Sequence, residues 1–244
     1  MIIDKILENQ RAWQSCSVDD EPTISHVALE SLSKCTDAIA ILGENLRSIG
    51  YVWVTSEKIP NDVLERNVTF IETRTGLSIP KVLDGFWKLV GGVSFVDLEN
   101  YQHTGFWEEN NINPKYGFAD GLHIEACTDE WAAFICDDYA DWKEYDTADE
   151  TDGFIMSLSP DGYHKDNISG GAPYGVFGES TWKPIWQNFE WSGEIQPVTA
   201  LCNPPDFLSY LRTTILECAG FPALLGLPAF ELIKRKILKG VPVF

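Results

Sequence analysis

The sequence has few basic residues. Only eighteen Lys and Arg stand against thirty-seven Asp and Glu, which gives a formal net charge of −19 at pH 7. A surface so poor in positive charge repels nucleic-acid phosphates and anionic membranes, so a protein that binds DNA, RNA or a membrane is excluded. The same charge attracts a basic protein partner and speeds the encounter with it.

Long apolar runs are also missing. No stretch approaches the ~20 apolar residues of a membrane span, and the opening MIIDKILENQRAW carries acids where a signal peptide would be basic. The six cysteines are scattered, with no C-x-x-C pair. They are Cys16, Cys35, Cys127, Cys136, Cys202 and Cys218. The sequence therefore predicts reduced thiols, several in apolar settings, and a cytoplasmic protein.

Familiar catalytic motifs are absent too. The chain contains no P-loop, no G-x-G-x-x-G and no G-x-S-x-G, and none of its four histidines pairs at metal-ligand spacing. His123 and Glu125 match the H-x-E of zinc deaminases, but the P-C-x-x-C that this motif needs does not follow. We therefore expect His123 to be a strand or loop residue with a local hydrogen bond. The sequence predicts no enzyme, no metal and no cofactor.

Apolar periodicity and turn residues predict the secondary structure. The predicted helices cover residues 36–49, 60–75, 81–90, 205–219 and 228–239. The predicted strands cover residues 51–54, 93–96, 131–136, 153–158 and 174–177. Residues 1–35 show weak periodicity, and we expect them to wrap around the rest or fray. Helices that flank a strand-rich centre predict the α+β class.

The negative charge is concentrated in the middle of the chain. Residues 121–170 hold thirteen acidic and two basic residues, so eleven of the nineteen excess charges lie in fifty residues. A calcium loop is excluded, because neither Gly153 nor Gly162 gives the EF-hand spacing of acids. Two interpretations stay open: a solvated acidic loop, or a partner-binding face in which aromatic residues supply contact area. The candidate partner-binding residues are Asp137, Asp138, Tyr139, Asp141, Trp142, Glu144 and Tyr145.

The stretch SPDGYHKDNISGGAPYGV, residues 159–176, is rich in turn residues. Its glycines lead into an extended Y-G-V-F rather than a helix, which argues against a phosphate cradle. We expect a double turn between two strands, with a small-ligand loop as the alternative. The candidate ligand residues are Asp161, His164, Lys165 and Asp166.

A series of short motifs resembles the SUKH superfamily, which includes the yeast cell-wall-synthesis regulator and many bacterial immunity proteins. Its members open with a helix that ends near a glycine, then Leu/Ile-Pro, a second helix and Gly-Gly before the sheet. Here this order runs from Ile71 to Gly76, through Ile79 and Pro80, to the glycine pair at 91–92. The segments SPDGYHKDNISGGAPYG and FLSYLR…CAGFP are also similar to bacterial proteins grouped with this superfamily.

The resemblance implies one α+β domain over residues 1–244, with helices around a mainly antiparallel, bent sheet. Residues 60–225 would form the SUKH-like core, between an N-terminal helical extension (1–59) and a C-terminal helix (226–244). It also implies a non-enzymatic protein that neutralises a basic toxin domain, often a nuclease. A regulatory scaffold of the cell-wall-synthesis type is one alternative. A carbohydrate-binding or carbohydrate-hydrolysing protein is another, suggested by paired acids and by Trp182, Trp186 and Trp191.

Overall fold

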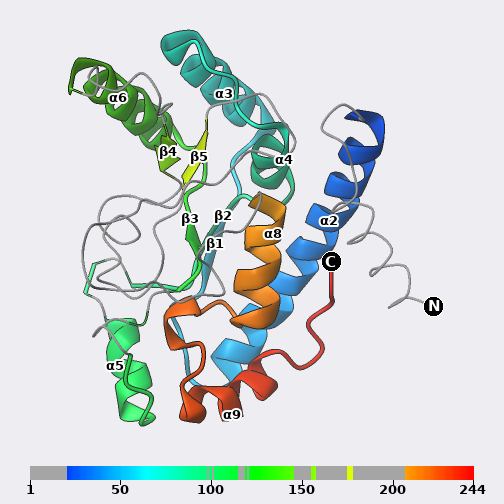
Figure 1. Cartoon of the computed structure of the whole chain (residues 1–244), viewed down its shortest axis with the longest axis vertical. Helices are drawn as coiled ribbons and strands as arrows, with labels where there is room; N and C mark the ends of the chain where they lie inside the picture. The colour runs from blue at the N-terminus through cyan, green and yellow to red at the C-terminus, as the bar shows by residue number, and fades with distance from the viewer. Residues whose placement is uncertain are drawn as a thin grey trace.

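The computed structural model describes residues 21–97, 99–100, 102–114, 119, 121–145, 155–157, 175–177 and 207–244. Seven α-helices and five short β-strands lie in these ranges, which confirms the predicted α+β class (Figure 1). The helices are α2 (Glu21–Ser48), α3 (Asn61–Thr75), α4 (Lys81–Leu89), α5 (Gln102–Glu109), α6 (Asp129–Tyr145), α8 (Phe207–Arg212) and α9 (Pro228–Ile237). The strands are β1 (Thr55–Glu57), β2 (Gly92–Ser94), β3 (His123–Ile124), β4 (Ile155–Ser157) and β5 (Gly175–Phe177).

Strands β1, β2 and β3 form an antiparallel sheet with β2 in the centre. Side chains alternate between the two faces of a strand. Val93 pairs with Ile124, and both are at most 2% exposed because they face the core. The neighbouring row of Thr55, Ser94 and His123 therefore faces the other side of the sheet. The sheet thus has one apolar face and one polar face.

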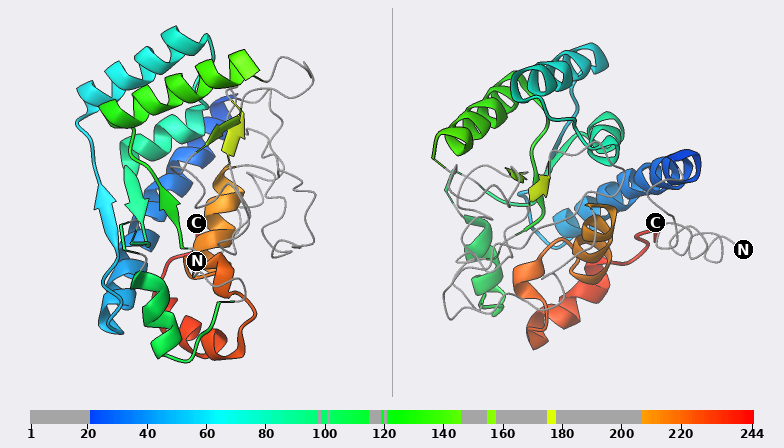
Figure 2. Two further views of the ribbon diagram at one scale, coloured as in Figure 1. Left: turned by 90° about the vertical axis from the view of Figure 1, so that its left-hand side faces the viewer. Right: turned by 45° about the horizontal axis from the view of Figure 1, so that its top comes forward.

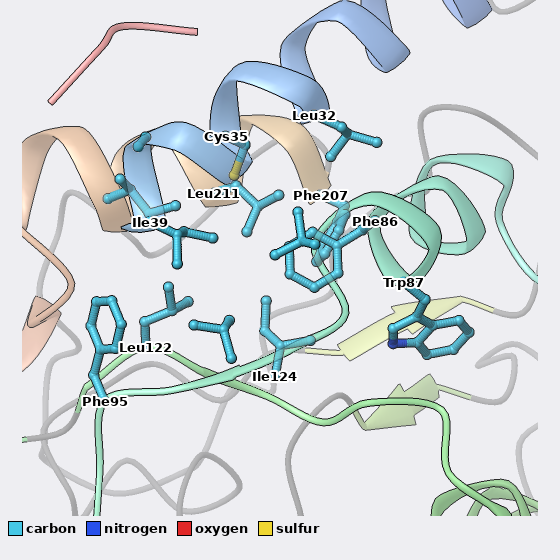
Figure 3. Close-up of a cluster of buried hydrophobic side chains, with 14 of the residues drawn as sticks. Leu32, Cys35, Ile39, Phe86, Trp87, Phe95, Leu122, Ile124, Phe207 and Leu211 are labelled. Atoms are coloured by element: carbon cyan, nitrogen blue, oxygen red, sulfur yellow. The ribbon is translucent and has the colours of Figure 1, made fainter. Parts of the chain in front are cut away.

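The hydrophobic core lies between the apolar face of the sheet and the helices α2, α4 and α8 (Figure 3). The labelled side chains come from α2 (Leu32, Cys35 and Ile39), α4 (Phe86 and Trp87), α8 (Phe207 and Leu211) and the region of β2 and β3 (Phe95, Leu122 and Ile124). Most of them point toward one another, with Trp87 at one side of the cluster, and all are less than 8% exposed. Burying a side chain of this size contributes roughly 1.5–3 kcal/mol.

Helices α3 and α6 pack side by side at one end of the sheet (Figure 2, left). Asn67 of α3 donates a hydrogen bond from Nδ2 to the carbonyl oxygen of Cys127, at 2.8 Å. Arg66 forms an ion pair with Asp129 at the start of α6. These contacts fix the beginning of α6 against α3, and therefore the direction in which its acidic residues project.

Four of the five predicted helices agree closely with α3, α4, α8 and α9. Pro60 and Pro80 precede α3 and α4 as predicted, and Gly76 ends α3 with a φ of 73°. The helix predicted over 205–219 is α8 followed by a π-helical turn, Thr213–Glu217. Strands are also found within the predicted ranges 153–158 and 174–177, and these two strands pair with each other.

The strand predicted over residues 131–136 is wrong, because this segment lies in α6. The buried residues Trp131, Ala132, Ile135 and Cys136 follow helical rather than alternating spacing. Thr128 caps the helix, since its Oγ1 accepts a hydrogen bond from the backbone N–H of Trp131 at 3.0 Å. The short apolar run is the first half of an amphipathic helix. The acidic residues that follow continue the same helix and supply its exposed polar side.

The N-terminal half of the chain differs from the prediction in two places. Helix α2 begins at Glu21, well before the predicted start at residue 36. The strand predicted over 51–54 is displaced to β1, because Tyr51 turns inward, is fully buried and donates its hydroxyl hydrogen to the carbonyl oxygen of Phe95. Helix α2 packs against α4, α8 and α9. The division of the chain at residue 59 stays a prediction.

Candidate functional site

The predicted partner-binding residues lie in the second half of α6. Asp137, Asp141 and Glu144 are exposed, and their spacing of four and three residues places them on one side of the helix. Glu130, two turns earlier, is exposed on the same side. We call Glu130, Asp137, Asp141 and Glu144 the acidic stripe. Within the described residues, no Lys or Arg forms an ion pair with any of the four.

Two of the predicted partner-binding residues, Tyr139 and Trp142, are aromatic and lie on a different side of α6 from the acidic stripe. Tyr139 and Trp142 are half-buried and pack against the hydrophobic core. Their ring centroids are 5.7 Å apart, and Nζ of Lys143 lies 5.6 Å from the Tyr139 ring and 6.0 Å from the Trp142 ring. With 3.6 residues per turn, Tyr139, two residues from both Asp137 and Asp141, lies on the side of α6 opposite the stripe. The pair therefore anchors α6 on the core.

The other two predicted partner-binding residues, Asp138 and Tyr145, are not shown to be exposed. Asp138 is half-buried, so it is neither sealed in the core nor fully presented to solvent. Tyr145 is the last residue of α6, and its side chain lies outside the described residues. The stripe of Asp137, Asp141 and Glu144 is therefore the part of the patch that the structure presents most openly.

The cysteines of this region lie in surroundings that favour the protonated thiol. Cys127, just before α6, and Cys136, within it, are free and buried. Burial raises the pKa of the Cys127 thiol to about 12 and also raises the pKa of Cys136. A thiol that stays protonated is a poor nucleophile. Cys35 and Cys218 are also free and buried, as predicted, and the other two cysteines lie outside the described residues.

A second candidate site is a hollow of about 380 Å³ over the polar face of the sheet. In the left view of Figure 2 the three strands lie in front of α2, with α6 and α3 above them and α5 below. The row formed by Thr55, Ser94 and His123 crosses this face. Gly92 pairs with Glu57 and leaves room for the backbone of Ala126, which a Cβ at position 92 would approach to 2.6 Å.

The hollow is acidic. Its lining includes Glu57, Asp97 and Glu125, and it includes neither Lys nor Arg. His123 is 3% exposed, and its Nε2 lies 3.1 Å from Oε1 of Glu125. A carboxylate only accepts hydrogen bonds, so the imidazole is the donor and holds Glu125 in one orientation. The half-buried ring of Trp53 forms an aromatic wall and packs edge-on against Tyr51, at a centroid distance of 5.3 Å.

Asp97 is fixed at the edge of the hollow by its backbone surroundings. Partial burial acts to raise its pKa, but hydrogen bonds from the backbone N–H groups of Asn100, Gln102 and Glu99 outweigh this and hold the pKa below its usual value. The N–H of Asp97 in turn donates to Nδ1 of His103, at 3.0 Å. Asp97 therefore carries its negative charge even in mildly acidic solution.

Sequence reasoning found part of this hollow. It marked His123 and Glu125 by their H-x-E spacing, and the expected strand position and local hydrogen bond of His123 are confirmed. The same spacing is the signal that both side chains share one face of a strand. Trp53, Glu57 and Asp97 were not identified, because only the pairing of β1 with β2 brings them to the same place.

Other predicted candidates lie outside the described residues. These are the loop residues Asp161, His164, Lys165 and Asp166, and the tryptophans Trp182, Trp186 and Trp191. The two strands expected to flank the loop are present as β4 and β5, and they pair antiparallel. Among the described residues, no three His, Cys, Asp or Glu side chains are grouped as a metal site would require.

The fold and these two sites define an α+β protein with an acidic helix and an acidic hollow. The chain matches no protein-family model, no curated protein and no solved structure. The resemblance to the SUKH superfamily therefore stays a prediction. Within the described ranges, every helix is too short or too polar to span a bilayer.

Proposed function

We propose that this protein is a non-enzymatic binding protein that engages a basic protein domain through the acidic stripe of α6. In this proposal it acts like an immunity protein and neutralises a toxin domain of the nuclease type. A nuclease needs a positively charged surface to hold phosphates, so an inhibitor of strong negative charge approaches it quickly and covers that surface.

The supporting observation is the exposure of four carboxylates on one side of α6 without a basic partner among the described residues. Like charges one turn apart destabilise a helix by roughly 0.2–0.5 kcal/mol per pair. Such a stripe works against the stability of the isolated helix. Cations supplied by a partner would relieve the repulsion, so the arrangement favours binding of a basic surface.

The net charge of the molecule supports the same proposal. The long-range field of a protein with a net charge of −19 steers a cationic partner toward it, and salt weakens this steering. The half-buried Tyr139 and Trp142, on the core-facing side of α6, hold the helix on the core. A rigid surface loses little conformational entropy on binding, which favours tight association.

The test compares two variants with the same charge change. The stripe variant combines Asp137→Asn, Asp141→Asn and Glu144→Gln. The control combines Asp37→Asn and Glu44→Gln on α2 with Glu109→Gln on α5, all exposed positions away from α6. Each protein is immobilised and used to capture partners from a lysate of the source organism, and the captured proteins are identified by mass spectrometry.

We expect the wild type and the control to capture the same basic protein and the stripe variant to lose most of it. We also expect the wild type to inhibit the nuclease activity of that partner at equimolar concentration. Equal capture by all three proteins would contradict a role for the stripe. A captured partner with no activity that the wild type inhibits would contradict the immunity-like part of the proposal.

A further inference from the structure

The acidic hollow on the polar face of the sheet is a feature that the acidic stripe does not explain. It lies over β1, β2 and β3, whereas the stripe lies on α6. Its volume of about 380 Å³ falls in the range of roughly 300–1,000 Å³ that is typical of small-ligand sites. A group from outside the fold can therefore enter it.

The charges in the hollow indicate which kind of group it accepts. Glu57, Asp97 and Glu125 contribute three carboxylates, and no lining residue is a Lys or Arg. An anion would be repelled. A cation would gain charge-assisted hydrogen bonds, which are about twice as strong as neutral ones.

The hollow is also built to hold its charge in place. The buried imidazole of His123 orients Glu125 through a hydrogen bond of 3.1 Å, and three backbone N–H groups orient Asp97. Trp53 adds an aromatic wall, against which a guanidinium group packs favourably. Carboxylates that are already fixed bind a cation without a further loss of side-chain entropy.

We propose that this hollow is a socket for the side chain of an arginine that the basic partner inserts. The proposal rests on the partner being basic, as proposed above, but it concerns a separate site. In this arrangement the stripe on α6 speeds the approach of the partner, and the socket holds one of its arginines in the final complex. Charge complementarity, the aromatic wall and the fixed carboxylates all favour a guanidinium group.

The test uses a small probe and needs no knowledge of the partner. A capped Gly-Arg-Gly peptide is titrated into the 15N-labelled protein, and a capped Gly-citrulline-Gly peptide of the same shape but without charge serves as the matched control. Binding is followed by the chemical shifts of the Trp53 indole N–H and of the backbone amides of β1 and β3.

We expect the arginine peptide to shift these signals at millimolar concentration and the citrulline peptide to leave them unchanged. The variant Glu125→Gln should weaken binding of the arginine peptide by about tenfold, because it removes a charge-assisted contact. The variant Glu65→Gln, an exposed position on α3, should not change it. The stripe variant should bind the arginine peptide like the wild type.

Several results would overturn the socket. These are no shift with the arginine peptide, equal binding of the citrulline peptide, shifts confined to α6, or full binding by a folded Glu125→Gln protein. If that variant does not fold, Glu57→Gln replaces it, with the same expected loss. Failure of the arginine peptide alongside stripe-dependent capture of a partner would remove the socket and leave the proposed function standing. Binding of the arginine peptide alongside equal capture by the wild type and the stripe variant would remove the role of the stripe and leave the socket standing.

Discussion

His103 is held as a neutral imidazole in the folded protein. It is fully buried on α5, and its Nδ1 accepts a hydrogen bond from the backbone N–H of Asp97. Burial lowers the pKa of His103 from 6.5 to about 4, although the negative charge of Asp97 acts in the opposite direction. The unfolded chain therefore takes up a proton at a higher pH than the folded protein does.

This difference predicts a loss of stability on acidification. The contribution of the neutral His103 is fully present above pH 6.5 and is lost as the pH falls toward 4, by about 3 kcal/mol in total. In the variant His103→Asn the amide oxygen can accept the same hydrogen bond and does not titrate. Urea unfolding at pH 7 and pH 4.5 should show a larger loss for the wild type than for the variant. Parallel losses would contradict the assignment.

Gly91 lets β1 and β2 approach each other. Its φ is 86°, and a Cβ at this position would lie 2.1 Å from the carbonyl oxygen of Glu57. We expect Gly91→Ala to lower the free energy of unfolding by about 3 kcal/mol, because it combines backbone strain with a backbone clash. The measurement is urea denaturation at neutral pH.

Gly76 provides the matched control for this prediction. Its φ is 73°, but nothing lies within 4 Å of a Cβ built there. Gly76→Ala should therefore cost only the backbone strain, about 1–2 kcal/mol. Equal effects of the two substitutions would show that the contact with Glu57 does not restrict position 91.

At the scale of secondary-structure elements, α2 is central to the fold. Leu42 lies on α2 and is fully buried in the core shared with α4 and α8. We expect Leu42→Ala to lower the free energy of unfolding by about 3 kcal/mol, through lost burial and the cavity that remains. Leu29→Ala on the same helix removes a side chain that is 43% exposed and should cost less than about 1 kcal/mol.

These two variants also bear on the organisation of the chain. If residues 1–59 were an extension that the rest of the protein does not need, Leu42→Ala would melt α2 and leave the unfolding of the remaining domain unchanged. The packing of α2 instead predicts one cooperative transition, shifted as a whole. Circular dichroism and tryptophan fluorescence should then report the same midpoint.

The helices were predictable where apolar periodicity coincided with Gly or Pro at the ends, as in α3, α4, α8 and α9. The strand predicted at 131–136 was wrong because a short apolar run does not distinguish strand from helix. The helical pattern becomes clear only when the acidic residues that follow are included. The capping residue Thr128 and the acidic first turn of α6 are local signals that predict a helix rather than a strand at this position.

The candidate sites were predictable to different degrees for a similar reason. Asp137, Asp141 and Glu144 of the acidic stripe lie close together on one helix and stood out as a cluster in the sequence. Glu130 was not identified, because the strand predicted over 131–136 separated it from them. The hollow joins segments from β1, β2 and β3, and its shape depends on sheet register. Register is set by pairing over long sequence distances, which a single sequence does not reveal.

At the scale of the whole molecule, the dominant property is charge. Net repulsion opposes the compact state, and salt screens it, with a Debye length of about 10 Å at 0.1 M ionic strength. The concentration of exposed acids on α6 is what links the charge to a particular surface.

The most direct measurement of this link is the association rate of the protein with its captured basic partner, followed by stopped-flow fluorescence over a range of salt concentrations. The wild type and the α2/α5 control variant should associate fast at low salt and slow down steeply as salt is added. The stripe variant should associate about tenfold or more slowly at low salt, with a flatter salt dependence. Identical rates and identical salt dependence for all three proteins would contradict the account.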